Sequence, residues 1–340
     1  MNVACNHPLV GIPDGVNPST GKTHYKILPY NERYFTDRYV TGAVAIPCGN
    51  CIGCRLDYSR QWANRCMLER KYHEDAWFVT ITYSPEAVPT TYFVDDSTGE
   101  AAPIYTLRKR DFQLFMKVLR RRTGQKVRYF AAGEYGDKTF RPHYHAIIFG
   151  LHLDDLQLSE FSPLDGPYKY YKSATLQKCW DVVDSKCKES MPLTRGNVLV
   201  APCSWETCAY VARYVVKKLK GPEAEFYKLH NIEPPFSLMS RKPGIGRQYY
   251  DDHPNLYDVE YINVSTPEGG RKFRPPKYYD RLREQADPDA YEQVKAFRRS
   301  LAETQKALLM TRSDRPYKEI LAVQGDALAA KVRALKRSVV

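Results

Sequence analysis

The segment that organises this chain is Arg141-Pro142-His143-Tyr144-His145-Ala146-Ile147-Ile148-Phe149-Gly150. β-Branched and aromatic residues follow Pro142 and end at a glycine, which predicts a β-strand. Side chains of a strand alternate between the two faces of a sheet, so His143 and His145 share one face and Tyr144 lies on the other. Two imidazoles side by side can bind one divalent metal ion. The alternative is a pair of surface histidines, because a bare His-x-His pattern is common.

The composition favours an anionic partner. The chain has 340 residues, with 51 Lys and Arg against 39 Asp and Glu, a net charge of +12. Basic charge together with 26 tyrosines suits single-stranded nucleic acid, whose phosphates attract cations and whose bases stack on aromatic rings. A basic protein with tyrosines in its core has the same composition. No apolar run approaches the roughly 18 residues that span a bilayer, and we expect neither membrane association nor a secretory signal.

The surrounding sequence predicts an α+β fold. Apolar and alternating runs predict strands at 76–83, 126–135, 142–151 and 197–201. Helical periodicity predicts helices at 56–73, at 106–122 with Thr106 as its cap, and at 204–219 with Ser204 as its cap. This order predicts an antiparallel sheet with helices packed on one side.

The remaining segments show weaker patterns. Residues 1–47 have no sustained period and are expected to be irregular, and residues 85–105 are expected to form a loop. The final stretch, about 287–338, is basic and helical in propensity.

Glu134 stands on the strand that precedes the two histidines. Residues 136–141 can join the two strands as an antiparallel hairpin, which would bring Glu134 beside His143 and His145. One carboxylate and two imidazoles form a three-ligand site with open positions. Such a site suits Mg²⁺ or Mn²⁺ and leaves room for a phosphate oxygen.

A second group lies on the helix expected at 204–219. Tyr210, Tyr214 and Lys217 are spaced by four and three residues, so they share one helix face. A tyrosine hydroxyl is a poor nucleophile at neutral pH, but a nearby ammonium group favours the phenolate. We therefore expect Tyr210 or Tyr214 to attack a phosphate at the metal site, with Lys217 assisting. The alternative is a tyrosine pair in the core, with lysines at a helix C-terminus where they suit the dipole.

The N-terminal third contains a run of cysteines. Cys48, Cys51 and Cys54 are spaced by three residues, and Cys5 could complete a tetrahedral Zn²⁺ site. His7 is another candidate for the fourth ligand. The Cys-x-x-Cys spacing is typical of zinc sites, although three cysteines in series without a second pair are unusual. The alternative is a reduced, partly buried turn.

A glycine-containing loop near residue 244 is a candidate contact for DNA. Its glycines, Gly244 and Gly246, could offer backbone N–H groups to a phosphate, and Arg241 and Lys242 could add charge. An ordinary turn is the alternative. The full set of expected DNA-binding residues is Arg213, Lys218, Arg241 and Lys242.

The ordered motifs resemble the HUH endonucleases, in which a bulky hydrophobic residue separates two histidines. The matching segments are Arg141-Pro142-His143-Tyr144-His145 and then Tyr210-x-x-x-Tyr214-x-x-Lys217. The chain is most similar to the rolling-circle replication initiation proteins of microviruses, in particular their gokushovirus branch. The segments that also match this branch are Pro47–Arg55, Phe78–Tyr83, Gly133–Gly136 and Ser240–Gly246. The resemblance covers about residues 47–250. A tyrosine in place of an aliphatic residue between the histidines is expected to matter little.

This resemblance implies an RRM-like sheet and a replication initiator. It implies nicking of single-stranded DNA at a phage origin, a 5′-phosphotyrosyl intermediate and rejoining of strands. The endonuclease core would be residues 76–221, with an insertion at 152–196, between an N-terminal arm (1–75) and a basic C-terminal extension (222–340). The partners would be origin DNA and the host replication helicase and polymerase, in the cytoplasm of the bacterial host. No Gly-x-x-x-x-Gly-Lys-Ser/Thr loop is present, so no fused helicase is expected.

Two other functions fit part of the pattern. A non-catalytic single-stranded DNA-binding or packaging protein with a structural zinc would explain the charge and the tyrosines. It would give no reason for the histidines, tyrosines and lysine to occur together. A plasmid initiator or transposase of the same superfamily would share the chemistry.

Overall fold

The computed structural model describes residues 5–19, 21–95, 97–163, 169–181, 194–214, 221–266 and 269–334. The chain forms two compact units, Ser59–Tyr279 and, separately, Met1–Tyr58 together with Asp280–Val340. These units are defined by packing. The division by function into residues 1–75, 76–221 and 222–340 stays a prediction.

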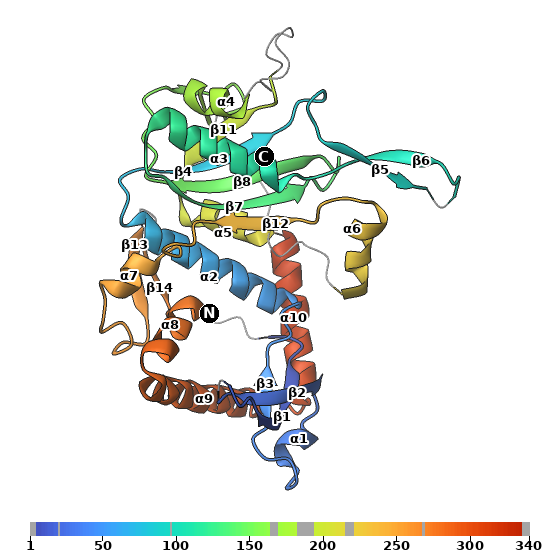
Figure 1. Ribbon diagram of the computed structural model, residues 1–340. Helices are drawn as coiled ribbons and strands as arrows, with labels where there is room; N and C mark the ends of the chain where they lie inside the picture. The colour runs from blue at the N-terminus through green and yellow to red at the C-terminus, as the bar shows by residue number, and fades with distance from the viewer. Residues whose placement is uncertain are drawn as a thin grey trace. The chain divides into compact units, whose positions relative to one another are not determined.

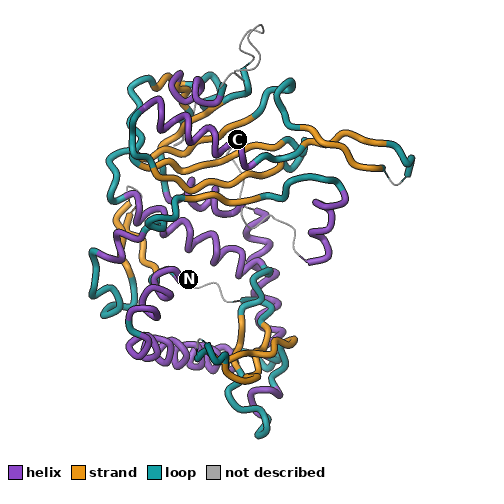
Figure 2. Tube along the Cα trace, in the orientation of Figure 1, coloured by secondary structure: helices purple, strands orange, loops and turns teal. Residues whose placement is uncertain are grey.

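A seven-stranded antiparallel sheet forms the centre of the larger unit (Figures 1 and 2). In order across the sheet its strands are β12 (Phe236–Met239), β7 (Arg128–Tyr135), β8 (Pro142–Phe149), β4 (Ala76–Thr82), β11 (Val198–Pro202), β10 (Tyr171–Ser173) and β9 (Leu156–Leu158). The four strands expected from the sequence are the four neighbours at its centre. The α+β class and the antiparallel sheet are therefore confirmed.

The centre of the sheet has a simple chain order. It runs β4, α3 (Lys109–Thr123), β7, β8, α4 (Ala174–Trp180), β11, while the strands lie in the order β7-β8-β4-β11. This is the β-α-β-β-α-β order of a split βαβ unit. The closer likeness to an RRM stays a prediction.

Helices cover both faces of this sheet (Figure 1). One hydrophobic core joins α3 and α4 to the face that carries Val79 and Ile148. A second core joins α5 (Trp205–Tyr214) and the part of α2 (Ile52–Arg70) from Ser59 onward to the face that carries Phe78 and Ile147. Packing on one side, as expected, describes α3 and α4 alone. The central strands are apolar on both faces, so each face needs a cover.

The helix ends follow local hydrogen bonding. Gly124 ends α3 in a left-handed conformation with φ of 68°, as predicted. Thr106 does not cap α3; its hydroxyl accepts a 2.9 Å hydrogen bond from the N–H of Glu233. Ser204 does cap α5, because its hydroxyl accepts a 3.2 Å hydrogen bond from the N–H of Thr207. The expected continuation of this helix to residue 219 lies outside the described residues.

Two segments that lacked a period in the sequence contain strands. In the larger unit β5 (Thr90–Val94) and β6 (Ala101–Tyr105) pair as a hairpin where a loop was expected. In the other unit β1 (Leu9–Val16) pairs with β2 (Thr23–Pro29) and β3 (Val44–Ile46) where an irregular arm was expected. Backbone pairing tolerates the prolines and glycines of these edge strands, which hide the alternation in sequence.

The remaining elements are short or helical. They are α1 (Arg33–Thr36), the 3₁₀ helix Gly221–Ala224, α6 (Glu225–Leu229), α7 (Arg247–Asp251), β13 (Ile262–Thr266), β14 (Gly269–Phe273), α8 (Lys277–Ala286), α9 (Pro288–Met310) and α10 (Tyr317–Ala334). The helical C-terminal extension is confirmed by α9 and α10. Among the helices described, none combines the length and the apolar character needed to cross a membrane.

Candidate active site and metal-binding groups

Glu134, His143 and His145 converge on one face of the sheet. The antiparallel pairing of β7 with β8 places Glu134 directly opposite His143. Oε1 of Glu134 lies 2.7 Å from Nε2 of His143 and 3.1 Å from Nε2 of His145. One ligand atom from each residue lies within 4.8 Å of the other two, so the group can hold a metal ion. The structure thus brings together the three residues that the hairpin argument had selected.

The site is buried and its carboxylate is ionised. Glu134 and His145 are each only 2% exposed. Burial raises the pKa of Glu134, but hydrogen bonds from His143 and His145 and their charge outweigh this and hold that pKa below its ordinary value. The carboxylate is therefore available as an anionic ligand at neutral pH.

The hydrogen bonds of His143 define which of its nitrogens faces the site. Nδ1 lies 3.1 Å from the backbone oxygen of Arg141, and a carbonyl only accepts, so Nδ1 carries the hydrogen. Nε2 then points at the carboxylate oxygen of Glu134. A bare Nε2 would place its lone pair against that oxygen, so the contact is favourable only with a proton or a cation between them. This donor set fits a divalent ion.

Two residues of β4 support His145, and the sequence argument did not single them out. The Thr80 hydroxyl lies 3.0 Å from Nδ1 of His145, directly across the β4–β8 pair. The Phe78 ring stacks on the imidazole of His145 with centroids 5.5 Å apart and planes 11° apart. The signal was a polar residue in a buried apolar strand, two positions from Phe78 and so on the same face.

Helix α5 places Tyr210 against the histidines. Its ring lies edge-on to His145, with centroids 5.1 Å apart, and 5.8 Å from the ring of Phe78. The guanidinium carbon of Arg213 lies 5.9 Å from the centroid of the Tyr210 ring. Tyr214 is the last residue of α5, one turn further along the chain. Its side chain, like Lys217 and Lys218 as a whole, lies outside the described residues.

The loop that contains Arg241 and Lys242 lies away from this site. It follows β12 near Arg128, at the opposite end of β7 from Glu134, roughly 20 Å along the strand. Both side chains are exposed. The structure does not bring them together with the histidines.

The glycines of this loop are held by the protein itself. The N–H of Gly246 donates a 2.7 Å hydrogen bond to Glu69, and Arg65 donates a 2.9 Å hydrogen bond to the backbone oxygen of Ile245. Gly246 has a φ of 74°, which a side chain would strain. Its amide is therefore occupied, which fits the ordinary turn rather than a phosphate cradle.

Four cysteines converge in the smaller unit. They are Cys5, Cys48, Cys51 and Cys54, and their sulfur atoms all lie within 4.8 Å of one another. Cys5 Sγ lies 3.6 Å from Cys48 Sγ and 3.8 Å from Cys51 Sγ. A tetrahedral site with metal–sulfur bonds of about 2.3 Å has sulfur–sulfur edges of about 3.8 Å. The group can therefore hold a metal ion, and His7 is not part of it.

Backbone N–H groups point at these sulfur atoms. The N–H of Asn6 lies 3.3 Å from Cys51 Sγ, and the N–H of Cys48 lies 3.3 Å from Cys5 Sγ. Burial raises the pKa of Cys51, but the N–H groups of Cys54 and Asn6 outweigh this and lower that pKa to about 7. Burial raises the pKa of Cys54. A thiolate at Cys51 beside neutral thiols is a starting point for metal binding, since the metal displaces the other protons.

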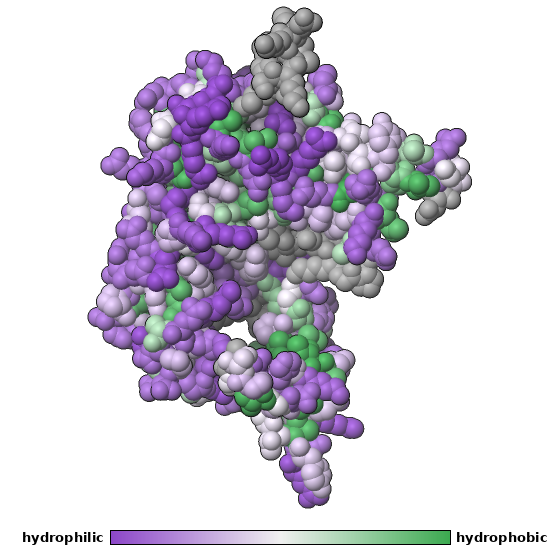
Figure 3. Space-filling view, viewed as in Figure 1, coloured by the Kyte–Doolittle hydropathy of each residue, from purple (hydrophilic) through white to green (hydrophobic). Residues whose placement is uncertain are grey.

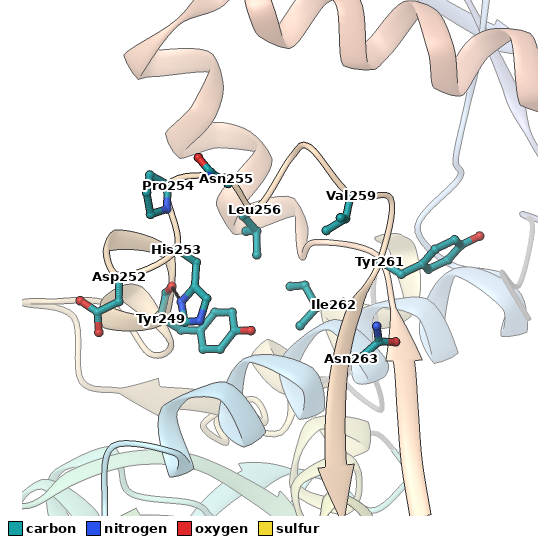
Figure 4. A pocket seen from close by; sticks show the side chains of 10 residues that line it. All are labelled: Tyr249, Asp252, His253, Pro254, Asn255, Leu256, Val259, Tyr261, Ile262 and Asn263. Carbon is teal, nitrogen blue, oxygen red and sulfur yellow. Dashed lines mark hydrogen bonds between the residues drawn. The ribbon is translucent and has the colours of Figure 1, made fainter.

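A separate pocket of about 480 Å³ lies between α7 and β13 (Figure 4). Tyr249 and His253 stack there with ring centroids 3.9 Å apart, and Ile262 and Asn263 of β13 form part of the opposite wall (Figure 4). None of the residues expected to act in catalysis or metal binding lines this pocket.

Comparison with known proteins identifies the family. The replication-associated protein ORF2 of Spiroplasma virus 4 is 30% identical over 297 residues, which cover 86% of this chain and 85% of that protein. The model of the replication-associated protein ORF2 family matches residues 76–219. The chain belongs to this family of replication-associated proteins. A role in replication follows from this membership.

Other relatives extend the same pattern. The replication-associated protein VP4 of Bdellovibrio phage phiMH2K is 27% identical over 277 residues, covering 77% of this chain and 76% of that protein. The replication-associated protein ORF4 of Chlamydia phage 1 is 30% identical over 181 residues, covering 51% of this chain and 38% of that protein. No solved structure matches the chain. The family segment 76–219 includes Glu134, both histidines and Tyr210, and excludes the four clustered cysteines.

Proposed function

We propose that this replication-associated protein is an HUH-type DNA endonuclease and strand transferase that initiates rolling-circle replication at a phage origin. The observation that carries the proposal is the packing of Tyr210 against His145, within the group formed with Glu134 and His143. A nucleophile and a metal-ligand set on facing elements are the parts that phosphoryl transfer to a tyrosine requires.

The chain's own groups define the metal site. Oε1 of Glu134 and Nε2 of His143 and His145 would hold Mg²⁺ or Mn²⁺. When bound, the ion supplies Lewis-acid polarisation of the scissile phosphate. The hydrogen bonds from Nδ1 of the two histidines, to Arg141 and Thr80, fix the ring orientations for this task.

The reaction at the tyrosine conserves the energy of the phosphodiester bond. The phenolic oxygen of Tyr210 or Tyr214 bonds to phosphorus, and the bond from phosphorus to the 3′ oxygen breaks. The 3′ oxygen takes up a proton and leaves as a hydroxyl, while the 5′ end stays on the protein as a phosphotyrosine. Attack by another 3′ hydroxyl reverses these steps and joins strands. Lys217 favours the phenolate, and two tyrosines one turn apart allow a second cleavage while the first end is held.

We also propose that the four clustered cysteines bind a structural Zn²⁺. The sulfur spacing of 3.6 and 3.8 Å fits tetrahedral zinc–thiolate bonding, and all four ligands are thiols, which structural zinc sites use. Metal analysis of protein purified without chelator should find about one zinc per chain. Less than half an equivalent would count against the site.

The partners and the location of action follow from the family as proposals. Single-stranded origin DNA would contact Arg213, Lys218, Arg241 and Lys242. The host replication helicase and polymerase would extend the nicked strand, in the cytoplasm of the bacterial host. The endonuclease core would be residues 76–221, flanked by the arm 1–75 and the extension 222–340.

One experiment separates the enzyme from a non-catalytic DNA-binding protein. The full chain is incubated with a labelled single-stranded origin oligonucleotide and Mn²⁺, and a covalent adduct is sought on a denaturing gel. His143→Ala should abolish the adduct and leave most DNA binding, because binding depends on phosphate contacts spread over the basic surface. Absence of an adduct with every origin-derived sequence would overturn the proposal.

A further inference from the structure

Helix α3 presents a face on which every exposed charge is positive. The exposed basic residues on and just after it are Arg110, Lys117, Arg120, Arg121, Arg122 and Lys126, named here the α3 basic stripe. Arg110, Lys117 and Arg121 lie within about 40° of one another around the helix axis, because their spacings are seven and four residues. Strongly hydrophilic side chains gather over the region of α3 (Figure 3).

Ion pairs at this helix leave the α3 basic stripe out. Lys109 pairs with Glu233 at 2.7 Å, and the buried Asp111 pairs with Arg195 at 2.6 Å. Beyond the end of α3, Asp75 and Asp154 both pair with His152, each at 2.7 Å. The carboxylates described around α3 are thus engaged with cations other than those of the stripe.

Helix stability does not account for the whole stripe. Arginines at the C-terminal end of α3 suit the helix dipole, but Arg110 lies in the first turn, where positive charge opposes it. A line of charge that continues into the unfavourable end of the helix indicates an external anion.

The stripe lacks what a single strand would need. The aromatic side chains of α3, Phe112 and Phe115, are 0% and 1% exposed and pack into the core against the sheet. Proteins that bind unpaired strands stack bases on exposed rings, whereas contact with a duplex backbone needs charge alone. The line from Arg110 to Arg121 is about 16 Å long, which corresponds to roughly five nucleotide steps of one strand of a duplex.

We propose that the α3 basic stripe binds the phosphate backbone of duplex DNA, without sequence preference. The stripe lies on the face of the sheet opposite to Glu134 and the histidines, because α3 belongs to the other core. The protein then holds a duplex on one face while a single strand occupies the other. The proposal rests on the proposed function only in taking DNA as the partner.

The test compares two triple variants of the full chain that lose equal charge. Arg110→Gln, Lys117→Gln and Arg121→Gln are combined in one. The control combines Arg312→Gln, Arg315→Gln and Lys318→Gln, which are exposed residues of the C-terminal extension. Binding to a labelled duplex and to a single strand of equal length is followed by fluorescence anisotropy over a salt series, without divalent ions.

The stripe variant should bind the duplex about 10- to 100-fold more weakly at roughly 0.1 M salt, with a salt slope smaller by about 2 to 3. The control should stay near wild type, and cleavage of a short single strand by the stripe variant should be unchanged. Equal losses in both variants, unchanged duplex binding, or a larger loss for the single strand would overturn the proposal. Wild-type duplex binding without nicking would overturn the nuclease instead, since the binding assay needs no cleavage.

Discussion

Thr80 and His145 lie directly opposite each other on neighbouring strands, with the threonine hydroxyl 3.0 Å from Nδ1 of the imidazole. This contact leaves Nε2 to face Glu134. A partner that orients a ligand typically changes metal affinity 10- to 100-fold. The Thr80 hydroxyl is therefore a positioning group for the metal site.

Thr80→Val should weaken Mn²⁺ binding by about 10- to 100-fold, because it removes the hydroxyl and keeps the shape of the side chain. Thr80→Ser should restore most of the affinity. Thr82→Val is the matched control on the same strand and face, and should bind Mn²⁺ like wild type. Calorimetric titration of the metal measures all three. Wild-type affinity in Thr80→Val would show that the contact does not orient the ligand.

The sequence predicted the centre of the sheet because one strand carried most of the information. Apolar residues follow the two histidines on both faces, and the short connection from Glu134 leaves an antiparallel hairpin as the natural pairing. The convergence of Glu134 with His143 and His145 needs nothing more than this register. Local pattern and tertiary pairing agree there.

Other parts depend on contacts that no local pattern encodes. Cys5 joins cysteines more than forty positions further on, which only the fold of β1 and β3 can bring about. Tyr144 was expected to matter little, yet its hydroxyl lies 2.6 Å from that of Tyr83 and donates to the backbone oxygen of Arg108 at 2.8 Å. Tyr144 is 1% exposed, so this network ties β8 to β4 and α3. Buried polar side chains need such partners, but the sequence does not name them.

Gly133 has a packing reason that the motif alone did not give. A Cβ at this position would lie 2.7 Å from the ring of Phe236 on β12. Gly133→Ala should lower the free energy of unfolding by about 1–3 kcal/mol, and a smaller side chain in Phe236→Leu should recover part of that loss. Urea unfolding of both single variants and the double variant measures the coupling. Strictly additive effects would contradict the clash.

Tryptophan fluorescence reports on the larger unit alone, since all four tryptophans lie within residues 59–279. Removal of zinc should therefore leave this signal unchanged, while amide hydrogen exchange should rise in β1, β3 and the first turn of α2. Cys51→Ala should reproduce the effect and lose the metal. The control Cys203→Ala, a buried cysteine outside the cluster, should keep its zinc. Exchange that does not change on chelation would argue against a structural role.

Acid should weaken the larger unit through Glu69. Burial raises the pKa of Glu69, but hydrogen bonds from His73 and Gly246 and the charge of Arg128 outweigh this and hold that pKa below its ordinary value. The resulting stability is present above the unfolded-state pKa of about 4.3 and is lost as pH falls through the lower folded-state pKa.

The free energy of unfolding should thus fall more steeply below about pH 4.3 in wild type than in Glu69→Gln. Urea unfolding followed by tryptophan fluorescence measures this, with the exposed Glu86→Gln as control. Parallel pH profiles for wild type and Glu69→Gln would rule out this contribution.

The position of the covalent bond tests the central proposal most directly. The adduct formed with an origin oligonucleotide and Mn²⁺ is digested with protease and nuclease, and the nucleotide-bearing residue is located by tandem mass spectrometry. The proposal predicts a 5′-phosphate on Tyr210 or Tyr214, with Tyr210→Phe and Tyr214→Phe each retaining partial cleavage and the double variant none. A nucleotide on any other residue, or cleavage that survives in the double variant, would contradict it.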